Sequence, residues 1–262
     1  AYCAGFGITS IHNMDGNFYT LDLLQEIDDA GQFLVRCQSP FHFKNYFTID
    51  RLADASAMHE RFRSERVSSG RVKFFMDGVL ESWTALTLRP YADKPGHFGD
   101  PNYTADEFNA LAIETDRRGL QIDVHAIGDG AVRRTIDGIE AAARTNGRRD
   151  ARHRIEHLEL TDTSDLPRLK ELGIIASIQP THAPGSVFPM EPTLSRIGRD
   201  LLDRAYAWAD IRDTGAAIFF NSDWPVSPLD PLISIQAALT RKRYADERDN
   251  RQTLMDTLAA YT

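Results

Sequence analysis

Four residues with metal-binding side chains stand at the ends of short β-branched or aromatic runs. His125, His157 and His182 close or follow three such runs, and Asp223 follows a fourth. Neutral imidazoles and an anionic oxygen can hold a divalent ion such as Zn²⁺ and leave a position where water becomes acidic. A carboxylate beside that water can take its proton and pass it to a leaving group. The pattern predicts a hydrolytic metal site, with Asp223 as the candidate base.

Each of these residues also has a structural interpretation. A single histidine at a strand end is more often hydrogen-bonded within the protein than bound to a metal. Asp223 precedes Trp224-Pro225 and can cap the loop that leads into the next helix. The occurrence of His125 and His157 on successive runs favours the metal interpretation.

Lys73 lies inside an apolar run, where a charged amine is costly to bury. Such a lysine extends its amine to water, pairs with an acid such as Asp77, or has a lowered pKa. The neutral amine can react with carbon dioxide to give an anionic carbamate, which can bridge two metal ions. A protonated lysine cannot bind a metal.

The elements that must position these residues follow a regular alternation. Strands are predicted at residues 7–12, 33–37, 71–76, 120–125, 153–158, 173–179 and 216–221. Helical spacing lies between them, at residues 18–30, 50–63, 105–118, 130–145, 163–172 and 201–214. Nearly continuous apolar strands that alternate with helices predict an α/β fold with a parallel sheet covered on both faces.

A closed barrel is favoured over a doubly wound open sheet. Neither G-x-G-x-x-G nor G-x-x-x-x-G-K-[ST] occurs in the chain, so the nucleotide-binding versions of the open sheet lose their main support. No linker or repeat divides the sequence, and we expect one domain over residues 1–262. In such a barrel the functional groups stand at the carboxyl ends of the strands.

Composition excludes several classes of function. The 262 residues include 30 basic and 38 acidic side chains, and a net charge of −8 argues against nucleic-acid binding by bulk charge. No apolar run reaches the roughly 18 residues of a membrane-spanning helix. Only Cys3 and Cys37 are present, too few for a disulfide framework. The cytoplasm is the default expectation for the compartment.

Several segments together resemble the amidohydrolase superfamily, and within it amidohydrolase family 3, which includes N-substituted formamide deformylase. The resemblance extends over nearly the whole chain, and its order and spacing are specific. The segments that carry it are Lys73-Phe-Phe-Met-Asp77-Gly78, Gly119 to Asp129, Arg154-Ile-Glu-His157, Ile178-Gln-Pro-Thr-His182 and Ser222 to Pro231.

The resemblance implies a distorted (β/α)8 barrel that hydrolyses an amide or a related bond with the help of metal ions. In the family pattern Lys73 is the carboxylated bridging ligand, and His125 and His157 bind one metal ion. Asp223 matches a ligand of the other metal ion and the proton-shuttling base. His182 matches a position near the substrate pocket, with a structural role as the alternative.

Two departures from the family pattern affect the expected site. Family members begin the barrel with a His-x-His strand that supplies two ligands, and no His-x-His occurs here. The predicted strands then correspond to barrel strands two to eight, with an unpaired edge on each side of the gap. We therefore expect one metal ion rather than two. Exposed edges also make a homo-oligomer an expectation, and His12 is a weak candidate for a replacement ligand.

Three functions compete at this point. The first is hydrolysis of a C–N bond in a small amide, formamide or cyclic amide, with zinc, iron, manganese or nickel as the metal. The second is an inactive remnant that binds one metal ion, a small ligand or a protein partner. The third is a metal-free barrel enzyme that binds phosphate. Such an enzyme needs glycine-rich loops after its last two strands, and residues 180–185 and 222–228 do not supply them.

Overall fold

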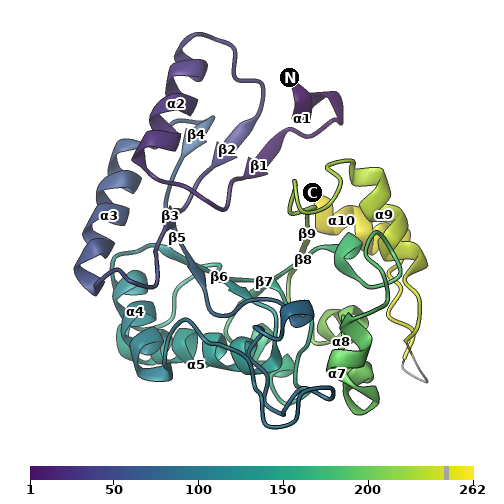
Figure 1. Cartoon of the computed structure of the whole chain (residues 1–262). Coiled ribbons are helices and arrows are strands. Elements are labelled where there is room, and N and C mark those ends of the chain that lie inside the picture. Colours follow the sequence, from purple (N-terminus) through teal and green to yellow (C-terminus); the bar gives the residue numbers. More distant parts are fainter. Residues whose placement is uncertain (245–247) are drawn as a thin grey trace.

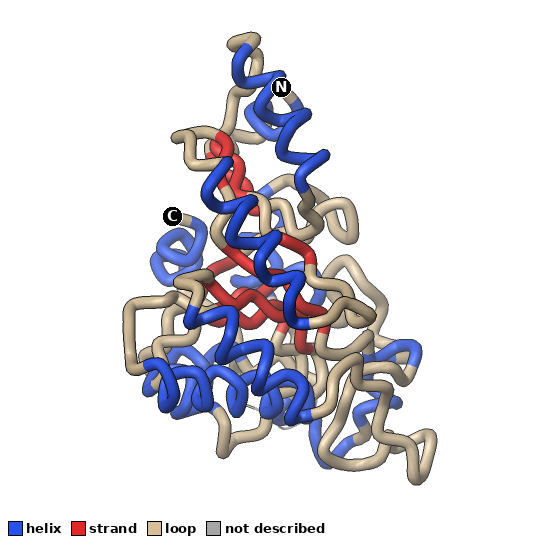
Figure 2. The backbone as a smooth tube through the Cα atoms, turned by 90° about the vertical axis from the view of Figure 1, so that its left-hand side faces the viewer, coloured by secondary structure: helices blue, strands red, loops and turns tan. Residues whose placement is uncertain are grey.

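Short apolar runs form a parallel sheet at the centre of the molecule, and helices lie outside it (Figure 2). The computed structural model describes residues 1–244 and 248–262. The strands are β1 (Ser10–His12), β2 (Arg36–Gln38), β3 (Phe41–His42), β4 (Val67–Ser68), β5 (Arg71–Phe75), β6 (Gln121–Ala126), β7 (Arg154–His157), β8 (Ile175–Ile178) and β9 (Ile218–Phe220).

The strands follow one another in chain order, and every pairing between them is parallel. One sheet has the order β1-β2-β4 and the other β3-β5-β6-β7-β8-β9. Strands β2 and β3 are two halves of one segment broken at Ser39 and Pro40, and β4 and β5 are broken at Ser69 and Gly70. Figure 1 shows the three-stranded sheet above the larger one. In the described part of the chain, β1 and β9 are not paired, which confirms the expected incomplete barrel.

Helices connect the strands in the predicted alternation. They are α1 (Tyr2–Gly5), α2 (Phe18–Asp29), α3 (Leu52–Arg61), α4 (Ala105–Arg117), α5 (Asp129–Asn146), α6 (Leu166–Glu171), α7 (Thr193–Ile197), α8 (Trp208–Asp213), α9 (Pro231–Thr240) and α10 (Leu254–Tyr261), with 3-10 turns η1 (Ile49–Arg51), η2 (Leu80–Ser82), η3 (Pro180–His182) and η4 (Arg199–Arg204). Among the residues described, no helix is long and apolar enough to cross a membrane.

The single helix predicted at residues 201–214 is wrong. Two pieces, η4 and α8, take its place, and Tyr206 between them has a left-handed backbone with φ of 51°. Its N–H donates to the carbonyl oxygen of Glu159 at 2.7 Å, outside any helix. A tertiary hydrogen bond therefore interrupts a segment whose sequence is periodic enough to form one helix.

The apolar core lies between the larger sheet and its covering helices. Val72, Phe74, Val124 and Ile155 are fully buried at alternate strand positions. The edge of the Phe108 ring of α4 meets the Phe74 ring, with centroids 5.6 Å apart. The intervening strand positions carry charges, so the prediction of nearly continuous apolar strands is wrong for the opposite, inner face of the sheet.

Helices α4 and α5 pack closely at Gly138, and we expect Gly138→Ala to destabilise the fold. A Cβ at this position would lie 2.6 Å from Phe108 Cδ1. Overpacking of this kind costs about 1–3 kcal/mol, more than the helix propensity that alanine adds. Urea unfolding measures the change, and Gly5→Ala is the matched control because its Cβ meets nothing within 4 Å. Equal stability of both variants would show that the helices separate without cost.

Candidate metal centre

A layer of buried charges forms the floor of the candidate site, on the inner face of the sheet. Asp123 Oδ2 accepts a hydrogen bond from Arg71 NH1 at 2.9 Å and lies 3.0 Å from Arg154 NH2. Arg154 Nε in turn is 2.6 Å from Glu156 Oε1. All four side chains are at most 5% exposed, so each charge depends on the others for its stabilisation.

Lys73 stands next to this floor and is fully buried. Its Nζ lies 3.9 Å from Asp123 Oδ1 and 5.0 Å from the centroid of the Phe75 ring. Burial lowers the pKa of Lys73, while the negative charges of Asp123 and Glu156 oppose that shift. Lower proton affinity favours the neutral amine that a carbamate requires.

Asp77 is not the partner of Lys73, which corrects the pairing considered from the sequence. Its carboxylate accepts hydrogen bonds from the backbone N–H groups of Leu86 (2.8 Å), Ile127 (3.1 Å) and Gly128 (2.9 Å). Burial raises the pKa of Asp77 to about 7, and these three bonds act in the opposite direction. Asp77 therefore joins the loops that follow β5 and β6.

His125 lies near the carboxyl end of β6, where its ring touches that of His157. The two ring centroids are 4.5 Å apart. The Nε2–H of His125 donates to the carbonyl oxygen of Gly78 at 2.9 Å, which leaves the Nδ1 lone pair free. Burial, followed by the charge of Lys73, lowers the pKa of His125 to about 3. The ring is thus neutral, the form in which imidazole binds metal ions.

His157 ends β7 and is oriented by a residue whose role the sequence did not predict. Its Nδ1–H donates to Gln179 Oε1 at 2.8 Å, and the Gln179 amide donates to Asn221 Oδ1 at 3.0 Å. The lone pair of His157 is therefore on Nε2. Burial is the main cause that lowers the pKa of His157. Gln179 belongs to the segment Ile178 to His182, which is one of the motifs in the sequence. Its role in orienting His157 was not predicted from that motif.

The structure brings His157, His182 and Asp223 together. One ligand atom from each lies within 4.8 Å of the others. Asp223 and His157 both have left-handed backbones, with φ of 52° and 82°, a strained conformation that is concentrated at functional sites. Burial raises the pKa of Asp223, and the positive charge of Lys73 is among the groups that oppose this.

This donor set fits a divalent ion. It combines imidazole nitrogens with a carboxylate, the ligands that zinc and related metals prefer. His182 Nε2 is buried, has no hydrogen-bond partner and lies 3.9 Å from Asp223 Oδ2. A buried acceptor without a partner is costly, and a bound cation would satisfy it. His125 and Lys73 lie beside this cluster rather than within it.

His12 has a structural role. Arg154 NH1 donates to its Nδ1 at 2.8 Å, and its ring stacks on Phe219 with centroids 5.6 Å apart. The contact joins β1 to β9 through side chains, across the edges that stay unpaired within residues 1–244 and 248–262.

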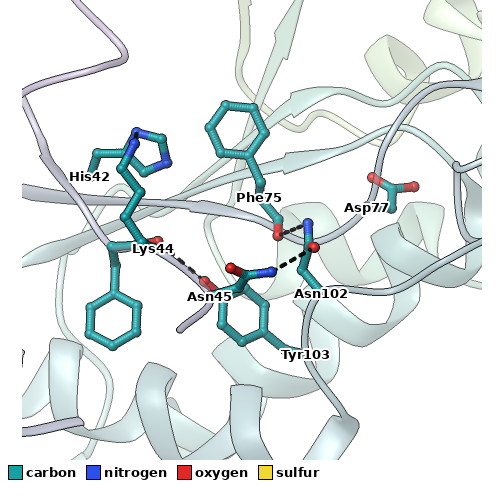
Figure 3. A pocket seen from close by; sticks show the side chains of 8 residues that line it. His42, Lys44, Asn45, Phe75, Asp77, Asn102 and Tyr103 are labelled. Atoms are coloured by element: carbon teal, nitrogen blue, oxygen red, sulfur yellow. Dashed lines mark hydrogen bonds between the residues drawn. The ribbon is translucent and has the colours of Figure 1, made fainter. Parts of the chain in front are cut away.

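A cavity of about 330 Å³ opens at the ends of β3 and β5 (Figure 3). Phe75 lines it and packs on His125, with ring centroids 4.9 Å apart. Lys44, Asn45 and Asn102 add polar groups to its wall, and Asn45 Nδ2 donates to Asn102 Oδ1 at 3.1 Å. The cavity thus offers space for a small molecule, and Phe75 connects its wall to His125.

An incomplete parallel barrel with imidazoles and a carboxylate at its strand ends is the fold of the metal-dependent hydrolases with a candidate metal site. Comparison with known proteins agrees: the sequence profile of the amidohydrolase family matches residues 1–262. The chain therefore belongs to the amidohydrolase family, in its family 3 branch.

Individual relatives support this assignment. YtcJ of Bacillus subtilis (strain 168) is 28% identical over 99% of this chain and 47% of its own length. N-substituted formamide deformylase of Arthrobacter pascens is 23% identical over 98% of this chain and 47% of its own. The crystal structure of an uncharacterised metal-dependent hydrolase from Pyrococcus horikoshii OT3 superimposes with a TM-score of 0.84 at 26% identity, covering 100% of this chain and 52% of that one. The chain spans about half the length of these proteins.

Proposed function

We propose that this chain is the metal-binding core of a hydrolase that cleaves a C–N bond in a small amide, formamide or cyclic amide. The observation that carries the proposal is the convergence of His157, His182 and Asp223 within 4.8 Å. Membership of the amidohydrolase family and the likeness to a formamide deformylase support the reaction class.

His157, His182 and Asp223 would hold one divalent ion, with His125 and Lys73 as further ligands beside them, Lys73 as its carbamate. Zinc is our first choice, and iron, manganese or nickel accept the same donors. When bound, such an ion supplies Lewis acidity for the substrate carbonyl and makes a water molecule more acidic. His125 and His157 remain neutral because burial lowers the pKa of each ring.

Asp223 takes the proton of the attacking water and delivers it to the departing nitrogen. Burial raises the pKa of Asp223, which suits this exchange because a carboxylate with a low pKa accepts a proton poorly. The cavity next to Phe75 receives the substituent of the substrate, and its polar wall orients the amide. Buried Asp77 fixes the loops around that cavity.

Replacing Asp223 by asparagine tests the catalytic assignment. Because Asp223 is also a proposed metal ligand, rates are compared per equivalent of bound metal. With a panel of N-formyl amines and cyclic amides, we expect kcat to fall by about 10²–10⁴ while KM changes little, because the variant lacks the proton acceptor. Asp93→Asn is the control, since Asp93 pairs with Arg196 outside the site. Hydrolysis that is equal in both variants would refute Asp223 as the base.

The second candidate is a protein that binds the ion without turnover. The unpaired edges of β1 and β9 in the described part of the chain, and the missing His-x-His, favour it. Bound metal with no hydrolysis of any amide in the panel would support this candidate.

A further inference from the structure

A buried acid–phenol pair stands behind His182 and is not used by the proposed reaction. Glu159 follows His157 by two residues, and Tyr206 O–H donates to its Oε2 at 2.9 Å. The main chains of the same two residues are joined as well, because Tyr206 N–H donates to the Glu159 carbonyl at 2.7 Å. One hydrogen bond to the carboxylate and one between the main chains thus hold Glu159 against Tyr206.

Tyr206 is itself held in a strained conformation. Its φ of 51° is unusual for a bulky side chain and costs free energy. Neighbouring contacts maintain it: Ala205 forms an isolated β-bridge with Leu160, and Arg241 NH2 donates to the Ala205 carbonyl at 2.8 Å. The surroundings of Tyr206 therefore keep its hydroxyl directed at Glu159.

The other oxygen of Glu159 faces His182. Glu159 Oε1 is 3.6 Å from His182 Nδ1, on the side of the ring opposite the unpartnered Nε2. The ring lies almost parallel to that of His157, with centroids 5.8 Å apart, and meets the edge of Phe188 at 5.4 Å. These two ring contacts restrict the rotation of the His182 ring.

We propose that Glu159, fixed by Tyr206, is a positioning residue that keeps the proton of His182 on Nδ1 and directs the Nε2 lone pair toward His157 and Asp223. His182 is thereby preset as a nitrogen ligand. Carboxylates that bond the far nitrogen of a metal-binding histidine act in this way. The ligand role rests on the proposed function, whereas the placement of the proton concerns the chain alone.

Nuclear magnetic resonance reads the proton placement directly. Long-range ¹H–¹⁵N correlations of the imidazoles at about pH 8, where histidine is neutral, distinguish the two tautomers. The signals of His182 are assigned by their loss in His182→Gln. We expect a proton on Nδ1 in the wild type and a mixture of tautomers in Glu159→Gln. Tyr206→Phe, which removes only a hydroxyl, should shift the tautomer population in the same direction by less.

Glu81→Gln is the matched control. Burial is the main cause that raises the pKa of Glu159, and the charge of nearby Glu81 adds to it, yet the Glu81 carboxylate accepts a hydrogen bond from Thr193 rather than from His182. This variant removes the same charge as Glu159→Gln, and we expect the wild-type tautomer. A proton on Nε2 in the wild type, or an unchanged tautomer in Glu159→Gln, would overturn the proposal.

Titration with Co²⁺ tests the ligand role separately. We expect Glu159→Gln to weaken Co²⁺ binding by about 10- to 100-fold and Glu81→Gln to leave it unchanged. Equal affinity of Glu159→Gln and the wild type would refute the ligand role while the proposed function stood. If the wild type had the expected tautomer but bound no Co²⁺, the ligand role and the proposed function would both fail, and only the proton placement would remain.

Discussion

Asp123→Asn is expected to lower the free energy of unfolding by about 3–5 kcal/mol. Among the described residues, Asp123 is the acid that contacts both Arg71 and Arg154, and both guanidinium groups are buried. Asparagine keeps the shape and removes the charge, so two buried cations would face each other with only Glu156 as a counter-ion. Urea unfolding followed by circular dichroism gives the difference.

An exposed ion pair provides the control for this prediction. Asp150 and Arg152 are 3.2 Å apart, with side chains 76% and 72% exposed. Water screens such a pair, and we expect Asp150→Asn to change stability by less than about 1 kcal/mol. A similarly small effect of Asp123→Asn would show that the charges under the site do not depend on one another.

His157→Ala is expected to abolish metal binding. The His157 ring lies next to both His125 and His182, with centroids 4.5 Å and 5.8 Å apart, so its loss separates the remaining donors and removes the ligand they share a site with. Elemental mass spectrometry after dialysis without chelator should find about one equivalent of metal in the wild type and almost none in the variant.

The control for this prediction is another histidine with a structural hydrogen bond. His59 in α3 bonds the Ser69 carbonyl through Nδ1 at 2.8 Å and is outside the cluster, so His59→Ala should retain the metal. Far-UV circular dichroism confirms that both variants fold. Full metal content in a folded His157→Ala would place the ion elsewhere.

Local signals in the sequence predicted most of the fold. The run at residues 120–125 became β6, and the helix predicted at 105–118 became α4, which starts at a capping box of Thr104 and Glu107. Helices α9 and α10 were not predicted, although Asp230 before Pro231 is a helix-start signal. The break at Tyr206 could not be predicted, because its cause is a bond to a residue 47 positions earlier.

In the site, too, features that depend on nearby sequence were predicted, and contacts between distant strands were not. The imidazoles and Asp223 were predicted because each stands at a strand end. The acid next to Lys73 was predicted wrongly. Asp77 is close to Lys73 in the sequence, but Asp123 lies opposite Lys73 in the register of β5 and β6. Arg154 is likewise opposite Asp123 in β7. Register between strands decides which charges meet, and a single sequence does not specify it.

The breaks at Pro40 and Gly70 divide the protein into two parts of unequal stability. Strand β1 has no buried residue and β2 has one, whereas nearly every residue of β6 and β7 is buried, so less apolar surface holds β1 and β2 in place. Hydrogen exchange would therefore find its amides opening at a lower free energy than those of β6 and β7. Every residue of the candidate donor cluster comes from β7 to β9 and the loops after them, so opening of the smaller sheet would leave the donors on strands of the larger one.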